Sequence, residues 1–550
     1  MRVASIPLAL CGGLFLVGLG CKSSGGDGGT GGSVGSAGTS GSGSAGTSGS
    51  AGTSGSGTAG TNGSGTAGTN GGSAGTNGSG TAGTNGSGTA GTKGSGTAGT
   101  NGSGTAGTNG GTAGRGGSTG TGGTGTASCT FTPTSSVSTK IPTVGIVTWS
   151  TTLSGVTEAH IDFGLTTSYG MTAPVDLTQT SYRTLLLGMK PSMMYHYRIA
   201  ASAGGNTCTS SDYTVMTGAL PNGTALPTLK VTTNNKAALY GGFLVTGSYQ
   251  GSTNQSFILD VDGAFVWWYA DGSDGCGTRM SYDGKYMWIA NGNVPGTNPS
   301  TTHVHRVTMD GLTDTDFSTP FANMSHQVTP LPDGSVAFYA NNSNGCDDIK
   351  LFPANGTPTS TATTLVNSKT AHGGNGMCHV NNIEYSASDD TLVFSDLDND
   401  CLTKVSRTTG ATVWVLNGIN NVKSTFTGDL WTGGEHGFHI ISPDDYLIFN
   451  NNPAGAIALE LMLNPTAKTS TKLWSYTANP VIKVSVLGDV QRMTANGPNG
   501  AGSGNTIVDF GTGDAVHEVN ASGTVLQTIT SGYPFGFMEK RATLYGPSTK

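Results

Sequence analysis

A strand–turn–strand unit recurs along the second half of the chain and limits its fold more than any other feature. Successive units are about 53 residues apart, and each is followed by a second hairpin-like stretch. The units begin at Cys276, His326, His379, His436 and Asp489. The stretch FILDVDGAFVWWYADG at 257–272 implies one more unit before them. Four short strands per repeat, six times over, predict an all-β chain with a six-bladed β-propeller over residues 225–548.

The last strand-like segment predicts how this repeat array ends. FMEKRATLYG, at 537–546, follows the sixth unit. A propeller loses its free edges when the last strand of the chain completes the first blade. We therefore expect residues 537–546 to pair with strands of the 226–268 region.

The N-terminal residues predict an exported protein on a long tether. Residues 1–21 hold one Arg and an apolar stretch that is too short to span a bilayer, as in a secretory signal. The segment is similar to a bacterial lipoprotein signal with Cys21 as the lipidated residue; simple cleavage and release is the alternative. Residues 22–127 repeat GSGTAGTN without apolar periodicity, which predicts a disordered Gly/Ser/Thr-rich tether. We expect a protein that is lipid-anchored at the bacterial cell envelope, with the membrane as a partner through the anchor.

The charge pattern excludes one class of partner. The net charge is −7, and only 10% of the residues are charged. The sequence has no cluster of Lys and Arg, which nucleic-acid binding requires. We therefore expect no nucleic-acid partner.

Residues 128–218 predict a separate small β-sandwich. Short strand-type runs alternate with turn signals, as in MYHYRIAAS at 194–202. Cys129 and Cys208 bracket the segment, and an exported protein would join them in a disulfide. The segment resembles the fibronectin type III-like modules of extracellular enzymes, whose corner motif matches Leu187, Pro191 and Tyr195. The resemblance implies a spacer, with binding as the less favoured role.

The repeat register brings three histidines together. The first strand of each blade lines the central channel, so residues at one repeat position meet at one end of it. His326, His379 and His436 occupy that position in three consecutive units. This pattern predicts a functional site. A zinc ion held by the three imidazoles is an alternative, but we predict neither a metal nor a cofactor.

Several segments resemble the bacterial arylsulfotransferase family. They are HVNNIEYSASDDTLVFS, TKVSRTTGATVWVLNG, EHGFHIISPDDYLIFNNN, GDVQRMTANG and GFMEKRATLYG, within residues 225–548. The resemblance implies transfer of a sulfuryl group from an aryl sulfate to a phenol through a transiently sulfated histidine, without a nucleotide donor. By motif, that nucleophile is His436. The His-x-Asn pair of the family falls on His379 and Asn381, and its earlier histidine on His326.

These residue types suit the chemistry. A neutral imidazole attacks sulfur and leaves again as a neutral group. Two further histidines can donate hydrogen bonds to sulfuryl oxygens and move the phenol proton. Asn381 adds an uncharged donor. A cation is also expected beside the transferring group, because negative charge spreads over its oxygens.

The sequence departs from the family at that cation. The family carries an Arg where an ungapped alignment of DDTLVFSDLDND places Leu397. Arg492 in the last unit is a candidate replacement. A non-catalytic binding propeller, displayed at the surface, therefore remains as an alternative function.

Two smaller patterns lie near the same sites. Carboxylates alternate over Asp396–Asp400, as at the start of a calcium loop, without the later ligands; a solvated acidic turn is the other interpretation. The cysteines that remain in the repeats allow three pairings. They are Cys276, Cys346, Cys378 and Cys401. We favour Cys378–Cys401 together with Cys276–Cys346.

Overall fold

The structure is a computed structural model, and its folded part begins at Cys129. It describes residues 129–221, 226–249, 255–269, 277–291, 302–342 and 344–547. The signal segment, Cys21, the tether and Cys276 lie outside these ranges, so the expectations placed on them stay predictions. Clustering of the fold assigns residues Gly125–Lys550 to one compact unit.

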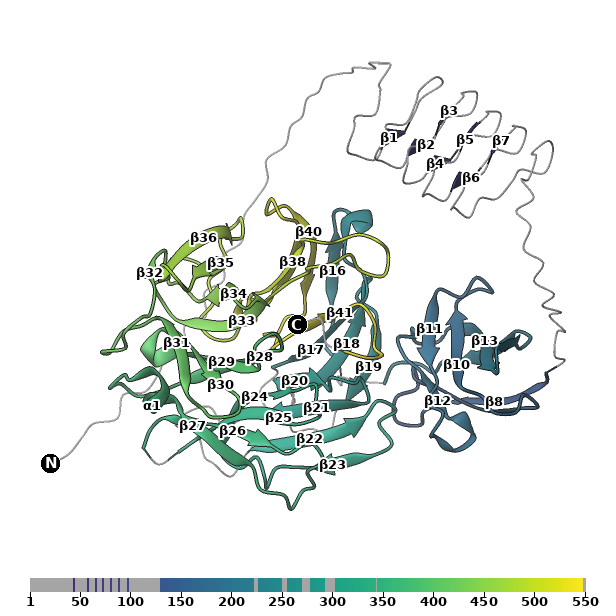
Figure 1. Cartoon of the computed structure of the whole chain (residues 1–550), viewed down its shortest axis with the longest axis horizontal. Helices are drawn as coiled ribbons and strands as arrows, with labels where there is room; N and C mark the ends of the chain where they lie inside the picture. Colours follow the sequence, from purple (N-terminus) through teal and green to yellow (C-terminus); the bar gives the residue numbers. More distant parts are fainter. Residues whose placement is uncertain are drawn as a thin grey trace, which may run out of the picture. The chain divides into compact units, whose positions relative to one another are not determined.

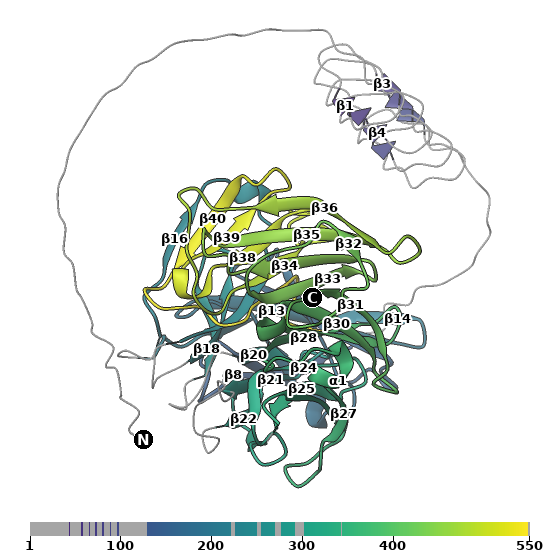
Figure 2. The ribbon, with the colours of Figure 1, turned by 90° about the vertical axis from the view of Figure 1, so that its left-hand side faces the viewer.

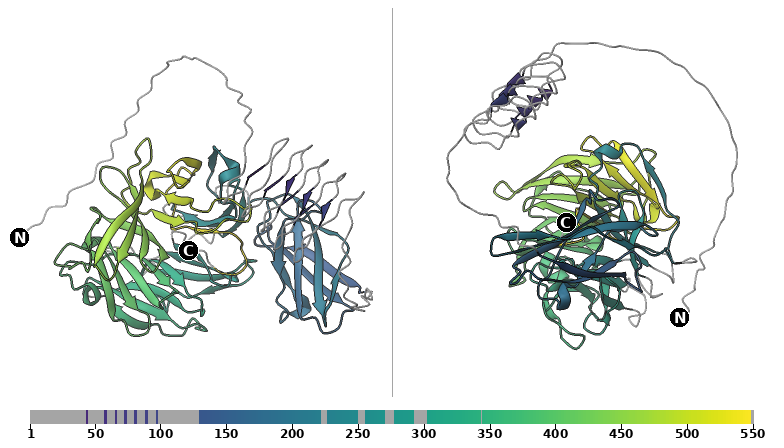
Figure 3. Two further views of the ribbon diagram at one scale, coloured as in Figure 1. Left: turned by 45° about the horizontal axis from the view of Figure 1, so that its top comes forward. Right: turned by 90° about the vertical axis from the view of Figure 1, so that its right-hand side faces the viewer.

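Residues 131–216 form two antiparallel sheets, drawn in blue in Figure 3. One sheet contains β10 (Glu158–Gly164), β11 (Met171–Pro174), β13 (Met194–Ala203), β14 (Asn206–Thr209) and β15 (Tyr213–Met216). The other contains β8 (Phe131–Val137), β9 (Gly145–Thr151) and β12 (Thr184–Leu186). Alternate residues of the strands face inward and share one core, around Trp149, Ile161 and Tyr197. The Cys129–Cys208 disulfide is present, as predicted.

The two-sheet segment also packs on the repeat region. The Thr143 hydroxyl donates to the carbonyl oxygen of Val266 at 2.7 Å. The Tyr545 hydroxyl donates to the Leu185 carbonyl at 2.9 Å and accepts from the Leu187 N–H at 2.7 Å. The segment is therefore fixed by buried hydrogen bonds to the repeat region.

The repeat region forms six separate sheets, with no strand pair joining one sheet to the next among the described residues (Figure 1). Their strand pairs are antiparallel, apart from the short parallel pair of β32 with β36 in the fifth sheet. The first sheet contains β17–β19 and β41 (Phe243–Ser248, Gln255–Asp260, Phe265–Tyr269, Glu539–Arg541). The second contains β20–β23 (Gly277–Met280, Tyr286–Asn291, His303–Thr308, Asp314–Asp316). The third contains β24–β27 (Met324–Pro330, Val336–Asn341, Asp347–Phe352, Thr363–Asn367).

The other three sheets complete the array. The fourth sheet contains β28–β31 (Val380–Ser386, Thr391–Asp396, Cys401–Ser406, Thr412–Asn417). The fifth contains β32–β36 (Thr427–Gly428, Glu435–Ser442, Asp445–Asn450, Ile457–Asn464, Thr469–Tyr476). The sixth contains β37–β40 and β16 (Asp489–Arg492, Thr506–Asp509, Val516–Val519, Val525–Thr530, Lys230–Thr233). A short helix, α1 (Ser368–His372), lies between the third and fourth sheets in the sequence. Figure 2 shows the strands of the fifth sheet side by side.

We call the strand at the inner end of each sheet its first strand, so that β33 is the first strand of the fifth sheet. The first strands of neighbouring sheets contact one another and line the inside of the array. β20 contacts β24, β24 contacts β28, β28 contacts β33, and β33 contacts β37. The Gln491 side chain of β37 then bonds both the N–H and the carbonyl of Lys540 in β41, at 2.6 and 3.0 Å. Residues of the second strands, such as Phe338 and Ile448, are fully buried because sheets pack on both of their faces.

Two pairings join the ends of this region. β41 pairs with β17, with Val245 opposite Glu539, which confirms the predicted pairing of residues 537–546 with the 226–268 region. β16 pairs with β40, with Val231 opposite Ile529. The first and last sheets therefore each combine strands from both ends of the repeat region.

Candidate functional site: a cluster of three histidines

The three histidines of the repeat register lie at the starts of three neighbouring first strands. His326 is in β24, His379 directly precedes β28, and His436 is in β33. Ring centroids of His326 lie 5.2 Å from His379 and 5.9 Å from His436. The structure therefore brings together the three side chains that the sequence placed in one ring.

Irregular backbone positions two of these rings. His326 has φ of 54°, and the pairing of β24 with β25 shifts register between Met324 and Val328. β33 has a similar shift between Glu435 and Phe438. A bulge turns side chains away from the regular alternation, and strained backbone of this kind clusters at functional sites.

His436 is neutral and is held in one tautomer. Its Nδ1 lies 3.1 Å from the carbonyl oxygen of Gly488, which can only accept a hydrogen bond. Nδ1 therefore carries the proton, and Nε2 keeps its lone pair. Burial, with His379 adding to it, lowers the pKa of His436 to about 4. The imidazole is neutral at pH 7, as a nucleophile must be.

His326 and His379 form a pair. Their Nε2 atoms lie 3.5 Å apart, so a hydrogen bond between them needs the proton on only one ring. The Ser325 hydroxyl lies 2.6 Å from His326 Nδ1. Burial lowers the pKa of both imidazoles, and His379 and His436 lower that of His326 further. Both residues are half-buried.

Asn381 lies behind the histidines. Its Nδ2 donates to the Glu435 carbonyl at 2.9 Å and so links β28 to β33. The side chain is 1% exposed, and its Oδ1 has no hydrogen-bond partner. One of the two Nδ2 hydrogens of Asn381 is thus used to hold β28 and β33 together.

The alternating carboxylates of Asp396–Asp400 separate into different environments. Asp396 is fully buried and accepts from the His379 N–H and from His372, each at 3.0 Å. Asp398 is exposed. Asp400 turns inward beside Glu435, at the start of β33. The three side chains therefore do not form one calcium loop.

The missing cation is not supplied by Arg492. Its guanidinium pairs with Glu460 and lies 4.6 Å from the centre of the Trp474 ring. Leu397 lies against Gly434, where a Cβ would be 2.1 Å from Leu397 Cδ1. Leu397 thus lies against a residue two places before His436, but it is apolar and supplies no cation.

A different guanidinium lies inside the array. Arg279 is 5% exposed and donates to Gln327 Oε1 at 2.9 Å, to the Met538 carbonyl at 3.1 Å and to Glu384 at 3.2 Å. Its Cζ lies 6.0 Å from the centre of the Phe537 ring, and that ring stacks on His436 at 5.2 Å.

Sequence reasoning missed Arg279, although a signal was present. The residues three places after the histidine position are Arg279, Thr329, Asn382, His439 and Arg492. The same register argument would have predicted a second polar layer there.

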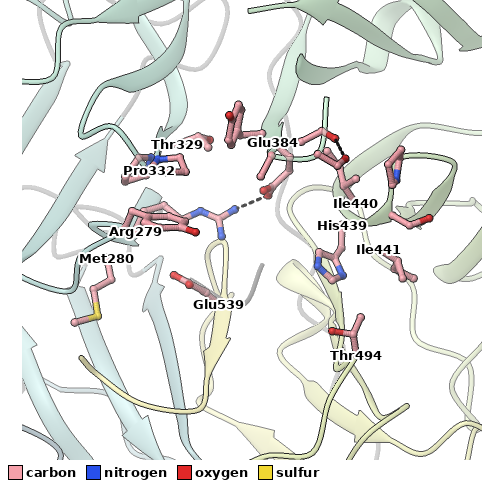
Figure 4. Close-up of a pocket in the computed structure, with 18 residues that line it drawn as sticks. Arg279, Met280, Thr329, Pro332, Glu384, His439, Ile440, Ile441, Thr494 and Glu539 are labelled. Carbon is pink, nitrogen blue, oxygen red and sulfur yellow. Dashed lines mark hydrogen bonds and ion pairs between the residues drawn. The ribbon is translucent and has the colours of Figure 1, made fainter. Parts of the chain in front are cut away.

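Three residues of this second layer, Arg279, Thr329 and His439, line a cavity. Figure 4 shows Arg279 paired with Glu384, and Glu539 and His439 facing the same space. The cavity has a volume of about 420 Å³. Its wall includes Met280, Pro332, Ile440, Ile441 and Thr494. It thus combines charged groups with apolar surface, as ligand pockets do.

The predicted disulfides in the repeats need correction. Cys346 bonds to Cys378, while Cys401 is buried with a free thiol. The favoured Cys378–Cys401 pair is therefore wrong, and since Cys346 is already bonded, so is Cys276–Cys346. Burial raises the pKa of the Cys401 thiol, so it stays protonated.

Among the described residues, one compact group of three His, Cys, Asp or Glu side chains could offer metal ligands. Ligand atoms of His372, Cys378 and Asp396 lie within 4.8 Å of one another. Cys378 is in a disulfide and offers no thiolate. The three histidines of the candidate site do not form this group.

Among the described residues, no helix has the length and apolar character needed to cross a bilayer.

No family model and no curated protein matches the chain. Among solved structures, it is similar to the β-propeller domain of Cps50 (Swd1) from Myceliophteria thermophila, with 14% identity and a TM-score of 0.36 over 58% of this chain and 90% of that one. It is also similar to TolB from Acinetobacter baumannii, with 11% identity and a TM-score of 0.36 over 64% of this chain and 80% of that one. At such scores the fold assignment rests on the strand pairing instead. Separate antiparallel sheets with neighbouring first strands define a β-propeller protein.

Proposed function

We propose that the chain is an arylsulfotransferase-like enzyme that moves a sulfuryl group from an aryl sulfate to a phenol through His436. The observation that carries this proposal is the bond from His436 Nδ1 to the Gly488 carbonyl, because it leaves a neutral Nε2 lone pair among three histidines. The resemblance of residues 225–548 to that family agrees with the choice of His436.

The proposed reaction has two displacements at sulfur. In the first, Nε2 of His436 bonds to sulfur, the S–O bond to the aryl group breaks, and the phenoxide leaves. In the second, the acceptor phenol oxygen bonds to sulfur and the N–S bond breaks. The acceptor's proton ends on the released phenoxide, so the products are a phenol and a new aryl sulfate.

The His326–His379 pair is proposed to move that proton and to bind the sulfuryl oxygens. Its Nε2 contact lets one ring donate while the other accepts. Both rings are neutral at pH 7, because their pKa values are lowered. Asn381 is proposed to hold β28 and β33 in place and to offer its remaining amide hydrogen.

The rest of the proposal concerns the setting of this site. We take the six sheets as six blades of one closed propeller and residues 128–218 as a fibronectin type III-like module. Cys21 is proposed as the lipidated residue that anchors the exported protein at the cell envelope. Palmitate labelling of the wild type and of Cys21→Ala tests the anchor, and loss of label in the variant is the expected result.

An assay with 4-nitrophenyl sulfate and phenol tests the function. We expect nitrophenol release by the wild type and none by His436→Ala. The matched control is His517→Ala, because His517 is also buried with a pKa lowered to about 4 but lies in β39, and we expect it to retain activity. Release that survives His436→Ala would contradict the choice of nucleophile.

A non-catalytic binding propeller is the second candidate. The cavity of about 420 Å³ beside Arg279 favours it, since it offers charged groups and an apolar wall and is not lined by His326, His379 or His436. The apolar Leu397 at the arginine position favours it too. If neither the wild type nor Leu397→Arg releases nitrophenol, this second function is the better one.

A further inference from the structure

Two carboxylates from different sheets face each other next to the histidine site. Glu435 is 0% exposed, and neither of its Oε atoms has a hydrogen-bond partner. Asp400, from the turn between β29 and β30, lies within hydrogen-bonding reach of Glu435, and its Oδ1 also has no partner. Asp400 is 9% exposed. Two acceptor groups thus meet in a nearly dry interior.

A third acceptor comes from the neighbouring strand. Asn450 of β34 is directly opposite Glu435, so both side chains lie on the same face of the sheet. Asn450 is 3% exposed, and its Oδ1 has no partner, while its Nδ2 donates to the Thr432 carbonyl at 3.0 Å. A Cβ on Gly433 would lie 3.1 Å from that Oδ1. The N–H of Gly433 lies beside Asp400. The three side chains therefore converge at Gly433.

The donors beside these oxygens are the Trp431 indole N–H and the Gly433 N–H, both at Asp400, and the N–H of Glu435 at its own carboxylate. The oxygen acceptors of the set still outnumber them. Buried acceptors are nearly always satisfied, and burying a carboxylate without a partner is strongly unfavourable. Either a proton shared by the two carboxyls or a bound cation can supply the missing positive charge. A shared proton would satisfy Asp400 and Glu435 but would leave Asn450 Oδ1 without a partner.

We propose that Asp400, Glu435 and Asn450 form a calcium-binding site. All the available ligand atoms are carboxylate and amide oxygens, which Ca²⁺ prefers, and the set contains no nitrogen or sulfur ligand for zinc. The oxygens come from three separate segments of the chain. Ca²⁺ tolerates such irregular geometry, whereas Mg²⁺ requires a near-ideal octahedron.

The location gives the ion a structural role. Asp400 belongs to the fourth sheet, while Glu435 and Asn450 belong to the fifth. An ion there joins the two sheets directly before His436, at the irregular pairing of Glu435 with Asn450. The proposal does not depend on sulfuryl transfer, because it concerns ion binding alone.

Terbium luminescence tests the site. Trp431 lies beside Asp400 and can sensitise Tb³⁺, which replaces Ca²⁺ in oxygen sites. In chelator-treated full-length protein we expect Tb³⁺ emission upon excitation of tryptophan, displaced by Ca²⁺. We also expect millimolar Ca²⁺ to raise the Tm by at least about 3 °C.

Three variants locate the ion. Glu435→Gln and Asp400→Asn should each weaken Tb³⁺ binding at least about tenfold. Asp398→Asn is the matched control, since Asp398 is in the same turn but exposed, and it should bind as the wild type does.

Three results would overturn the proposal. The first is a wild-type protein that shows neither Tb³⁺ emission nor a Tm that depends on Ca²⁺. The second is Tb³⁺ emission that Glu435→Gln leaves unchanged. The third is a Glu435→Gln variant that is more stable than the wild type at pH 7 in saturating Ca²⁺. The last would indicate a shared proton. The wild-type measurements decide alone if a variant fails to fold.

Discussion

His436 Nδ1 and the carbonyl oxygen of Gly488 lie 3.1 Å apart, so the first strand of the fifth sheet is bonded to the residue that precedes the first strand of the sixth. The same carbonyl accepts from the Gly437 N–H at 3.0 Å. The tautomer of the proposed nucleophile is thus fixed by backbone alone. No carboxylate is needed to hold it, and the ring stays neutral.

The pH dependence of the first step follows from this neutral ring. His436 has a pKa of about 4 in the folded protein, so it loses its lone pair only as the pH falls through about 4. The single-turnover rate with 4-nitrophenyl sulfate should therefore be flat from pH 7 to about pH 5 and fall below that. Stopped samples brought to alkaline pH report the nitrophenol. An acid limb near the ordinary histidine value of about 6.5 would contradict the assignment.

Leu397→Arg should raise the rate of nitrophenol release. Leu397 lies against Gly434, two residues before His436, and a guanidinium there would meet the charge on the sulfuryl oxygens. One preorganised charge partner contributes about 10²–10³ in turnover. Leu397→Met is the control without charge. The carboxylates of Asp396 and Asp398 compete for the new cation, so Leu397→Arg combined with Asp398→Asn should be faster still. Equal rates for all four proteins would contradict this role of the position.

Replacement of Arg279 should destabilise the fold. Its guanidinium is buried with Gln327, Glu384 and the Met538 carbonyl, so Arg279→Met removes the cation that pairs with Glu384. Removing one member of a buried pair costs about 3–5 kcal/mol. Arg407→Met is the control, because Arg407 pairs at the surface and should cost about 1 kcal/mol or less. Denaturant unfolding measures both, and equal losses would contradict the central role of Arg279.

Removing residues after 530 should unfold the propeller. The deletion removes β41, which supplies the innermost strand of the first sheet and the partner of Gln491. A chain that ends at residue 547 is the control and should keep the wild-type Tm. The truncated chain should lack a cooperative thermal transition, as followed by circular dichroism. A truncated protein with an unchanged Tm would show that β41 is dispensable.

The repeat spacing predicted much of this arrangement, because a propeller strand has a fixed place in its sheet. The register alone placed His326, His379 and His436 together, and the need to cover free strand edges placed residues 537–546 against the 226–268 region. The alternation of residues 194–202 likewise predicted the strand whose alternate residues are buried in the two-sheet core.

The remainder depended on loops, whose paths no periodicity specifies. Cys378 pairs with Cys346 because the segment before β28 folds back on the turn after β25, where the Cys378 N–H donates to the Gly345 carbonyl. Asp400 has a φ of 52°, and with this backbone conformation it reaches from the fourth sheet to Glu435 in the fifth. Arg279 was missed because the register was followed at one position only.

The exchange of strands between the two ends of the repeat region has a consequence for how the protein is made. β16, near the beginning, lies at the outer edge of the last sheet, and β41, near the end, lies at the inner edge of the first. A growing or emerging chain therefore cannot complete the last sheet before residue 530 or the first sheet before residue 541. Contacts so distant in sequence form slowly. If the protein crosses a membrane N-terminus first, the first sheet is completed only after nearly the whole chain has crossed, so export and folding are separate in time.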